Sequence, residues 1–326
     1  MARQRHSFRR AIDTGLWGLG AGLAAVAALR WAGTPPSPVA IGVQGMTPWL
    51  LVPSFPLALV AGGRRRPALA AVALALGAAQ IAAIAPELGP LRPVTVPDDA
   101  ARIRLVTANI LLDNPDPEGL AAEITSLGPD VVLLQEVTPW GLLALRSTGL
   151  LERFPHHVLD AREGGHGSAI LSRIPLRDGR AISVAEWPMT RADITTATGP
   201  VRLVNVHAAA PLSGPGIRVW RRQLEELARI APPPGGRLVL AGDFNATSQH
   251  PPFRDLVRQG LRDGHDVAGR GLAPTWPSGR RWLPPLLRLD HVLVGDGVTV
   301  VSVRRTRGTG SDHRFLSADL AFPARG

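Results

Sequence analysis

The sequence has 326 residues, which is enough for one large domain and a further segment. It contains no cysteine, which excludes disulfides, zinc–thiolate sites and cysteine nucleophiles. The formal charge is +10 and every basic residue is arginine, a bias typical of a high-GC genome. Such a charge is compatible with nucleic acid, lipid headgroups or phosphorylated substrates and does not choose among them.

Three long apolar runs lie in the first hundred residues. None contains a charged residue, and they extend from Thr14 to Leu29, from Trp31 to Gly63 and from Pro67 to Pro86. A bilayer span needs about 20 apolar residues, and prolines would kink the second run if it is helical. A cleaved signal peptide is disfavoured because a soluble pattern would follow it, not two more apolar runs. We therefore predict three transmembrane helices in a membrane domain at residues 1–88.

Arginines near the ends of these runs predict their orientation, because cytoplasmic loops carry an excess of positive residues. Seven arginines precede the first run or separate the second from the third: Arg3, Arg5, Arg9, Arg10, Arg64, Arg65 and Arg66. Only Arg30 separates the first run from the second. We therefore expect a multi-pass protein of the cell membrane with a cytoplasmic N-terminus. Three crossings would place the chain after Pro86 outside the cytoplasm, where a proline-rich linker at residues 89–101 begins.

Residues 102–326 alternate short apolar strands with amphipathic helices, which predicts one α/β domain. Strands are expected at 102–110, 131–134, 167–173, 191–198, 201–206, 238–240, 289–294, 298–303 and 315–321. Helices are expected to begin near Pro117, Pro139, Gly216 and Pro252. The sequence shows no internal repeat.

Six strand boundaries of this domain carry side chains of types that bind metals or move protons. They are Asn109, Glu136, His207, the pair Asp243 and Asn245, Asp290, and the pair Asp312 and His313. One strand-end aspartate alone more often caps a turn than catalyses a reaction, but six such boundaries are difficult to explain as turns. Residues i and i+2 of an extended segment share a face, so Asp243 and Asn245 could address one bound group.

These residues stand in motifs that resemble those of the endonuclease/exonuclease/phosphatase superfamily, in the same order and with similar spacing. The motifs are Thr-Ala-Asn-Ile at Asn109, Gln-Glu-Val at Glu136, Asn-Val-His at His207, Gly-Asp-Phe-Asn at Asp243, Leu-Asp-His-Val at Asp290 and Ser-Asp-His at His313. The resemblance covers residues 102–321. It implies a four-layer α/β/β/α sandwich, in which helices flank two packed mixed β-sheets. It also implies hydrolysis of a phosphoester or phosphoanhydride with Mg²⁺, or with Mn²⁺ as an alternative.

The resemblance also implies which residues would hold the metal ion. Glu136 would be the main ligand with Asn109 beside it, since Mg²⁺ takes few, hard oxygen ligands. Asp290 would be a second ligand or would orient His207. Many family members place a tyrosine against the phosphate, whereas this chain has none. His166 is the candidate substitute, and a solvated loop histidine is the alternative interpretation.

The remaining residues receive catalytic roles by the same resemblance. His313 would face the reacting phosphate, and Asp312 would fix its tautomer. Asp243 would position or deprotonate the attacking water, while Asn245 and His207 would donate hydrogen bonds to the phosphoryl oxygens. Either Asp243 or His313 could be the general base.

A segment at residues 275–288 combines apolar bulk with arginines and leads into a predicted strand. Arg280 and Arg281 are candidate substrate contacts, since arginine beside tryptophan suits a bilayer interface or a lipid phosphate headgroup. The alternative is that Trp282 and Leu286 pack on the domain.

Three N-terminal spans before such a domain also resemble the VanJ-type membrane proteins associated with glycopeptide (teicoplanin) resistance. That resemblance implies an extracytoplasmic phosphatase for a lipid-linked substrate such as undecaprenyl pyrophosphate, with a role in recycling cell-wall lipid. One alternative is an anchored extracellular nuclease, although its broad basic groove and stacking aromatics are not evident in the sequence. Another alternative is a non-catalytic membrane protein that binds a phosphate or lipid, which the complete residue set disfavours.

Overall fold

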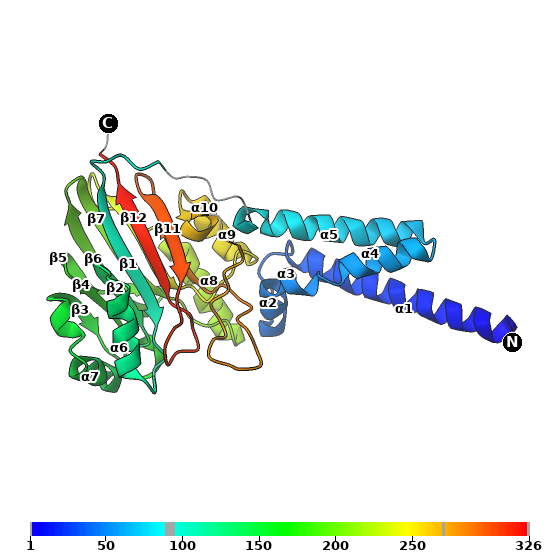
Figure 1. Cartoon of the computed structure of the whole chain (residues 1–326), viewed down its shortest axis with the longest axis horizontal. Coiled ribbons are helices and arrows are strands. Elements are labelled where there is room, and N and C mark those ends of the chain that lie inside the picture. Colours follow the sequence, from blue (N-terminus) through cyan, green and yellow to red (C-terminus); the bar gives the residue numbers. More distant parts are fainter. Residues whose placement is uncertain (1, 89–94, 269–270, 325–326) are drawn as a thin grey trace. The chain divides into compact units, whose positions relative to one another are not determined.

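The computed structural model describes residues 2–88, 95–268 and 271–324 (Figure 1). Its contacts divide the chain into two compact units. The helical unit contains Met1–Pro86 with Ser248–Pro251, and the sandwich unit contains Glu87–Thr247 with Pro252–Gly326. The linker predicted at residues 89–101 falls partly on residues 89–94, outside the described residues.

The helices of the N-terminal region are α1 (Ala2–Leu29), α2 (Pro38–Gly45), α3 (Thr47–Leu50), α4 (Ser54–Gly63) and α5 (Pro67–Leu88). Two described segments, Ser7–Leu29 and Pro67–Glu87, are long and apolar enough to cross a membrane. The middle run is broken, because its helical parts, Pro38–Gly45 and Thr47–Gly63, meet at an angle of 67°. The described residues therefore offer two candidate spans, or three if the bent pair is one span, and the predicted number of three is approximate.

Prolines account for the interruptions of the middle run. Pro48 lies in the first turn of α3, and Pro53 immediately precedes α4. A proline has no N–H to continue the helical hydrogen bonds of the preceding turn, so each proline favours the start of a new helix. The expected kink is thus present.

An ion pair joins two distant parts of the helical unit. Arg64 Nε, at the turn between α4 and α5, donates a hydrogen bond of 3.0 Å to Asp13 Oδ1 in α1. Arg66 pairs with the same carboxylate. The early part of α1 therefore lies beside the end of α4.

The sandwich unit contains two six-stranded mixed sheets. The first has the order β11-β12-β1-β2-β4-β3, with bounds β11 (Thr299–Arg305), β12 (Leu316–Phe322), β1 (Ala101–Asn109), β2 (Val131–Gln135), β4 (Ser168–Ser172) and β3 (His156–Asp160). The second has the order β5-β6-β7-β8-β10-β9, with bounds β5 (Leu176–Val184), β6 (Trp187–Thr196), β7 (Gly199–His207), β8 (Arg237–Asp243), β10 (Asp290–Val294) and β9 (Arg262–Asp263).

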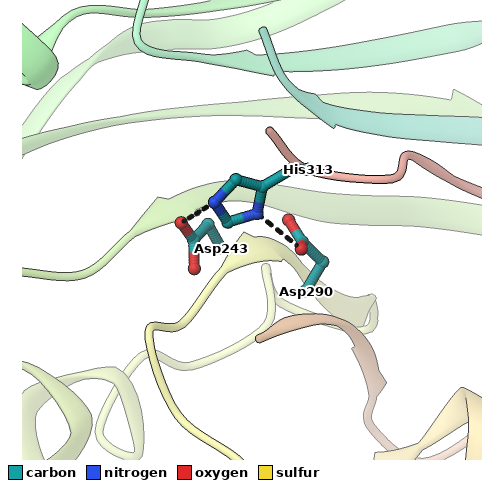
Figure 2. Close-up of side chains that lie close together, drawn as sticks. All are labelled: Asp243, Asp290 and His313. Carbon is teal, nitrogen blue, oxygen red and sulfur yellow. Dashed lines mark hydrogen bonds and ion pairs between the residues drawn. The ribbon is translucent and has the colours of Figure 1, made fainter. Parts of the chain in front are cut away.

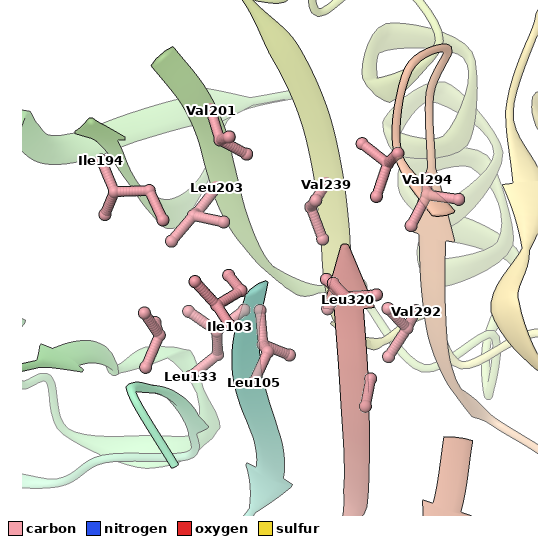
Figure 3. Close-up of a cluster of buried hydrophobic side chains, with 14 of the residues drawn as sticks. Ile103, Leu105, Leu133, Ile194, Val201, Leu203, Val239, Val292, Val294 and Leu320 are labelled. Atoms are coloured by element: carbon pink, nitrogen blue, oxygen red, sulfur yellow. The ribbon is translucent and has the colours of Figure 1, made fainter. Parts of the chain in front are cut away.

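Apolar side chains from both sheets form one buried core between them (Figure 3). Leu105 and Leu320 of the first sheet meet Leu203 and Val239 of the second, and all four are fully buried. On the outer face of the first sheet, a second apolar cluster buries residues of α6 (Pro117–Ser126) and α7 (Pro139–Ser147).

Helices of the second sheet's side include α8 (Gly214–Leu227), α9 (Pro251–Arg258) and the short α10 (Gly264–Ala268). Trp220 of α8 is fully buried, and its Nε1 donates a hydrogen bond of 3.1 Å to Phe244 O, just beyond β8. The predicted four-layer α/β/β/α sandwich is therefore confirmed.

Three strands, β3, β5 and β9, have no counterpart among the predicted elements. β5 is exposed along most of its length, β3 is only partly buried, and β9 has two residues. Edge strands such as these lack the apolar pattern from which buried strands are predicted.

A buried polar network connects the two sheets. Gln135 Nε2 of the first sheet donates hydrogen bonds to Asn205 Oδ1 (2.6 Å) of the second and to Thr107 Oγ1 (3.0 Å) of its own. Asn205 Nδ2 in turn donates to Thr190 Oγ1 and to two main-chain oxygens of the first sheet, at 2.8 and 3.0 Å. Ser168 and Thr190 hydroxyls are 3.1 Å apart. Such directional contacts fix how the sheets align.

Candidate active site

Strand pairing brings the strand ends that carry the predicted site residues to one end of the sandwich. β1 and β2 are parallel and β7 and β8 are parallel, so the carboxyl ends within each pair lie together. His207 is paired with Asp243 across β7 and β8, and Asp290 is paired with Asp243 across the antiparallel β10. Three of the predicted polar side chains therefore lie side by side on neighbouring strands.

Asn109 links a carboxylate of each sheet. Its Nδ2 donates to Glu136 Oε1 at 2.9 Å and to Asp243 Oδ2 at 3.2 Å. The other oxygen of Glu136 accepts the Leu112 N–H at 3.1 Å. Glu136 itself has φ +62, the left-handed conformation, so the chain turns sharply at this position. These three side chains form one wall of the site.

His207 faces both carboxylates without a direct ion pair. Its Nε2 is 3.8 Å from Glu136 Oε1 and 4.0 Å from Asp243 Oδ2. Burial lowers the pKa of His207 and outweighs the opposite effect of Asp243, so the imidazole is neutral at pH 7. Burial also raises the pKa of Asp243, despite the cationic His313 nearby.

His313 lies between two carboxylates (Figure 2). Its Nδ1 is hydrogen-bonded to Asp290 Oδ2 at 2.9 Å, and its Nε2 is 3.7 Å from Asp243 Oδ2. Burial lowers the pKa of His313, but the carboxylates of Asp290 and Asp243 prevail and raise it to about 10. The imidazole is therefore cationic at neutral pH.

The partner predicted for His313 was wrong. Asp312 Oδ2 accepts a hydrogen bond of 3.0 Å from Trp276 Nε1, and Asp290 takes the place beside the imidazole. Asp312 and His313 lie in a bend before β12, and their side chains contact different neighbours. Asp290 accordingly contacts His313, not His207 as one of its predicted roles required.

Asn245 is hydrogen-bonded to protein oxygens. Its Nδ2 donates to Ala208 O at 2.8 Å and lies 3.5 Å from Asp243 Oδ2, while its main-chain N–H donates to Asp243 Oδ1 at 2.8 Å. Both contacts of this amide are with protein oxygens, and the predicted contact of Asn245 with a phosphoryl oxygen stays a prediction. In this structure Asn245 fixes the orientation of Asp243.

Gly242 is required for the approach of β8 to β7. It has φ +146, and a Cβ at this position would lie 1.9 Å from Val206 O. Any other residue would displace the main chain just before Asp243.

Two residues that the sequence did not single out hold the segment that carries His313. Ser311 Oγ donates to Asn109 O at 2.7 Å and accepts the His313 N–H at 3.0 Å. Glu123 of α6 accepts four hydrogen bonds from Thr306, Gly308 and Thr309. Burial opposes ionisation of Glu123, yet these bonds hold its pKa below the usual value. Ser311 belongs to the Ser-Asp-His motif, whereas no sequence signal marks Glu123.

His166 lies near the site but is exposed. Its ring packs edge-on against Trp187 with centroids 4.3 Å apart, and its charge would lower the pKa of His207. A Cβ on the neighbouring Gly165 would be 3.9 Å from both His207 and Glu136, so this turn borders the site. The predicted substrate contact of His166 stays a prediction.

The segment at 275–288 is anchored at its base and exposed beyond it. Trp276 and Leu287 exchange main-chain hydrogen bonds of 2.9 and 2.8 Å. Arg280 and Arg281 are exposed, and Trp282 is 78% exposed. Trp282 therefore does not pack on the domain, and the alternative interpretation is wrong for this residue.

The donor set fits a divalent cation. Asp243, Asp290 and His313 offer ligand atoms within 4.8 Å of one another, and Asn109 joins Glu136 to the same group. Three carboxylates share this end of the sandwich with one cationic imidazole, which leaves excess negative charge. Oxygen donors with uncompensated charge suit Mg²⁺ or a similar hard ion.

The profile of the endonuclease/exonuclease/phosphatase family matches residues 106–313. The chain belongs to this family. Its members are metal-dependent phosphoesterases and nucleases, and the chain is a hydrolase of that class. No curated protein matches the chain significantly.

The sandwich unit is also similar in fold to solved structures. An endonuclease/exonuclease/phosphatase from Beutenbergia cavernae DSM 12333 is 20% identical with a TM-score of 0.52, covering 68% of this chain and 72% of that one. The corresponding protein from Bacteroides vulgatus is 21% identical with a TM-score of 0.53, covering 68% and 99%. D. rerio TDP2 complexed with a single-strand DNA product is 17% identical with a TM-score of 0.55, covering 67% and 98%.

The contacts of His313 predict unequal effects for two neighbouring aspartates. We expect Asp290→Asn to lower the Mg²⁺-dependent rate on bis(p-nitrophenyl) phosphate by about 10²–10⁴-fold, because the imidazole loses its orienting charge. Asp312→Asn is the matched control and should stay within about tenfold of the wild type, since it weakens one hydrogen bond to Trp276. Equal losses in both variants would contradict this assignment.

The raised pKa of His313 predicts a pH-dependent stability. In EDTA, the folded-state value of about 10 exceeds the ordinary value of 6.5, so His313 stabilises the fold fully below pH 6.5. This stabilisation is lost as the pH rises through 10. The chain has no lysine, tyrosine or cysteine, so few other groups titrate in this range. We expect the midpoint of thermal unfolding to fall across it, and His313→Gln to flatten the decline. Parallel curves for the two proteins would refute the expectation.

Proposed function

We propose that the protein is a membrane-anchored, Mg²⁺-dependent phosphohydrolase that acts outside the cytoplasm on a lipid-linked pyrophosphate such as undecaprenyl pyrophosphate. The observation that carries the proposal is a buried carboxylate–histidine site in a chain whose N-terminal helices are apolar enough to span a membrane. Such an activity would recycle cell-wall carrier lipid and could thereby contribute to glycopeptide (teicoplanin) resistance.

In this proposal, Glu136 holds the metal ion with Asn109 and Asp290 nearby. When bound, Mg²⁺ would neutralise phosphate oxygens as charge develops during hydrolysis. Neutral His207 would donate a hydrogen bond to a phosphoryl oxygen. The cationic His313, oriented by Asp290, would donate another from Nε2.

The geometry favours Asp243 over His313 as the general base. Both ring nitrogens of His313 face carboxylates, at 2.9 and 3.7 Å, so the ring is held in its cationic form and cannot accept a proton. Asp243 has one oxygen fixed by the Asn245 N–H and the other facing Asn109, His207 and His313. That second oxygen is therefore suited to take the proton of an attacking water.

The direction of the helices supports an extracytoplasmic site. The ion pair of Asp13 with Arg64 brings the early part of α1 and the end of α4 together. In Figure 1, α1 and α5 run in one direction and α4 returns between them. If the bent middle run crosses the bilayer, α5 is the third crossing and the hydrolase domain lies opposite the N-terminus. If the run re-enters, the domain lies on the N-terminal side.

A nuclease is the second candidate. It is favoured by one observation, the similarity in fold to D. rerio TDP2, whose structure contains a single-strand DNA product. A non-catalytic phosphate- or lipid-binding protein is a weaker alternative. Binding of a phosphate or lipid alone would not require the complete set of buried site residues.

The proposal predicts which phosphate is released. We expect the purified full chain with Mg²⁺ to liberate phosphate from undecaprenyl pyrophosphate and to leave plasmid DNA intact. EDTA should abolish the release, and Asp243→Asn should reduce it by about 10²–10⁴-fold. Nicking of the plasmid without phosphate release from the lipid would replace this function with the nuclease. Full cellular phenotype in Asp243→Asn would favour the non-catalytic alternative.

The sidedness has its own test. Alkaline phosphatase is active only outside the cytoplasm, and green fluorescent protein fluoresces when it folds inside. We expect a fusion after Gly326 to be active with the first reporter and dark with the second. A control fusion after Arg66 should give the opposite pattern. Fluorescence after Gly326 together with alkaline phosphatase activity after Arg66 would mean that the middle run re-enters and that the substrate is cytoplasmic.

A further inference from the structure

Large apolar side chains are exposed at few positions of the sandwich unit. Among its described residues they are Trp140, Leu143, Leu212, Val267 and Trp282. The exposed fraction is 76% for Trp140, 80% for Leu212 and 78% for Trp282. Apolar side chains that gather on one face, unlike scattered ones, mark a surface that contacts another apolar body.

Four of these five residues belong to segments at the catalytic end of the sheets (Figure 1). Trp140 and Leu143 lie in α7, which begins directly after β2. Leu212 lies between β7 and α8, and Trp282 lies in the segment before β10. These segments are far apart in the sequence and share only their position at this end. We call these four residues the apolar rim.

Positive charge adjoins the apolar rim. Arg280 and Arg281 directly precede Trp282, both are exposed, and the sequence from Thr275 to Arg288 contains no acidic residue. Arginine binds phosphate groups, and tryptophan prefers the boundary between headgroups and acyl chains. The combination is therefore complementary to an anionic lipid surface.

The segment that carries Trp282 is held firmly at its base. Main-chain hydrogen bonds between Trp276 and Leu287 close the loop, and Trp276 Nε1 binds Asp312 next to the catalytic His313. A contact made by this loop therefore lies beside the site.

A small cavity lies between α6, α7 and the segment that follows β1. It has a volume of about 180 Å³ and is lined by Leu111, Leu112 and Trp140 among others. Pockets that enclose small-molecule ligands are commonly about 300–1,000 Å³. This cavity therefore does not enclose a long lipid chain, and none of the predicted site residues lines it.

We propose that the apolar rim, together with Arg280 and Arg281, is an interfacial surface that contacts an anionic bilayer and turns the catalytic end toward it. The occupant is a bilayer because the same chain carries helices that can span one. The chain from Leu88 to Ala101 extends to at most about 45 Å, which keeps that bilayer within reach. Leu143 and Leu212 provide no ring for stacking bases, which argues against single-stranded nucleic acid. This inference deepens the proposed function and rests on it.

The absence of cysteine permits a direct test. Trp282→Cys and Trp140→Cys would each carry a bimane probe in the full chain, reconstituted in vesicles of phosphatidylglycerol and phosphatidylethanolamine. Asp296→Cys is the control, because Asp296 is exposed in the turn after β10, at the opposite end of that strand. Relative to the control, we expect severalfold stronger quenching of both rim probes by a lipid-attached nitroxide and severalfold weaker quenching by aqueous iodide. Equal thermal midpoints would show that the variants fold.

Charge is tested separately. In the Trp282→Cys protein, the added Arg280→Gln and Arg281→Gln changes should restore quenching by iodide. A probe at position 140 or 282 that matches the control would overturn the proposal. The proposal would also be overturned if a single-stranded oligonucleotide, and not lipid, protected the probe at position 282 from quenching by iodide. Quenching does not depend on hydrolysis, so a lipid-protected rim without phosphatase activity would reject only the proposed substrate. Lipid hydrolysis with a water-exposed rim would reject only the surface.

Discussion

The alignment of the two sheets is the constraint on which the site depends. Asn109 and Glu136 come from the first sheet, whereas His207, Asp243 and Asp290 come from the second. Apolar packing between sheets tolerates small slides, but hydrogen bonds do not. Asn205 makes buried hydrogen bonds to Gln135 and to main-chain oxygens of the first sheet. These bonds lie next to the site and oppose sliding of one sheet over the other. They therefore determine whether the Asn109 amide can reach carboxylates of both sheets.

Once the sheets are aligned, electrostatics determines how the site behaves. Strand pairing places Asp243 beside Asp290, and Glu136 is joined to them through Asn109. Burial and the repulsion between neighbouring carboxylates raise the pKa of Asp243 and favour compensating positive charge. Without metal the cationic His313 supplies part of it, and a divalent ion would supply the rest. The fold thus favours binding of a cation before any substrate is considered.

Most strands and the position of the site could be predicted from sequence. Buried strands appear as apolar runs, and most of the site residues lie directly at the ends of those runs. The partner of His313 could not be predicted. Asp312 is adjacent in sequence, but Asp290 reaches the imidazole through antiparallel pairing of β10 with β8, and register between distant strands leaves no local signal. Strand β5 could not be predicted either, because it is exposed along most of its length and lacks an alternating apolar pattern.

Attachment to a bilayer changes what such a site must recognise. A soluble hydrolase commonly gains specificity by enclosing its substrate in a pocket. A domain held at the membrane surface meets lipid phosphates at a high effective concentration, so few contacts beyond the phosphate are needed. Selection of the substrate would then be set by the side of the membrane that the domain faces. Under the proposed function, that side depends on whether the bent run between α1 and α5 crosses the bilayer. Under the proposed function, the prolines that interrupt this run therefore help to decide which phosphates the site meets.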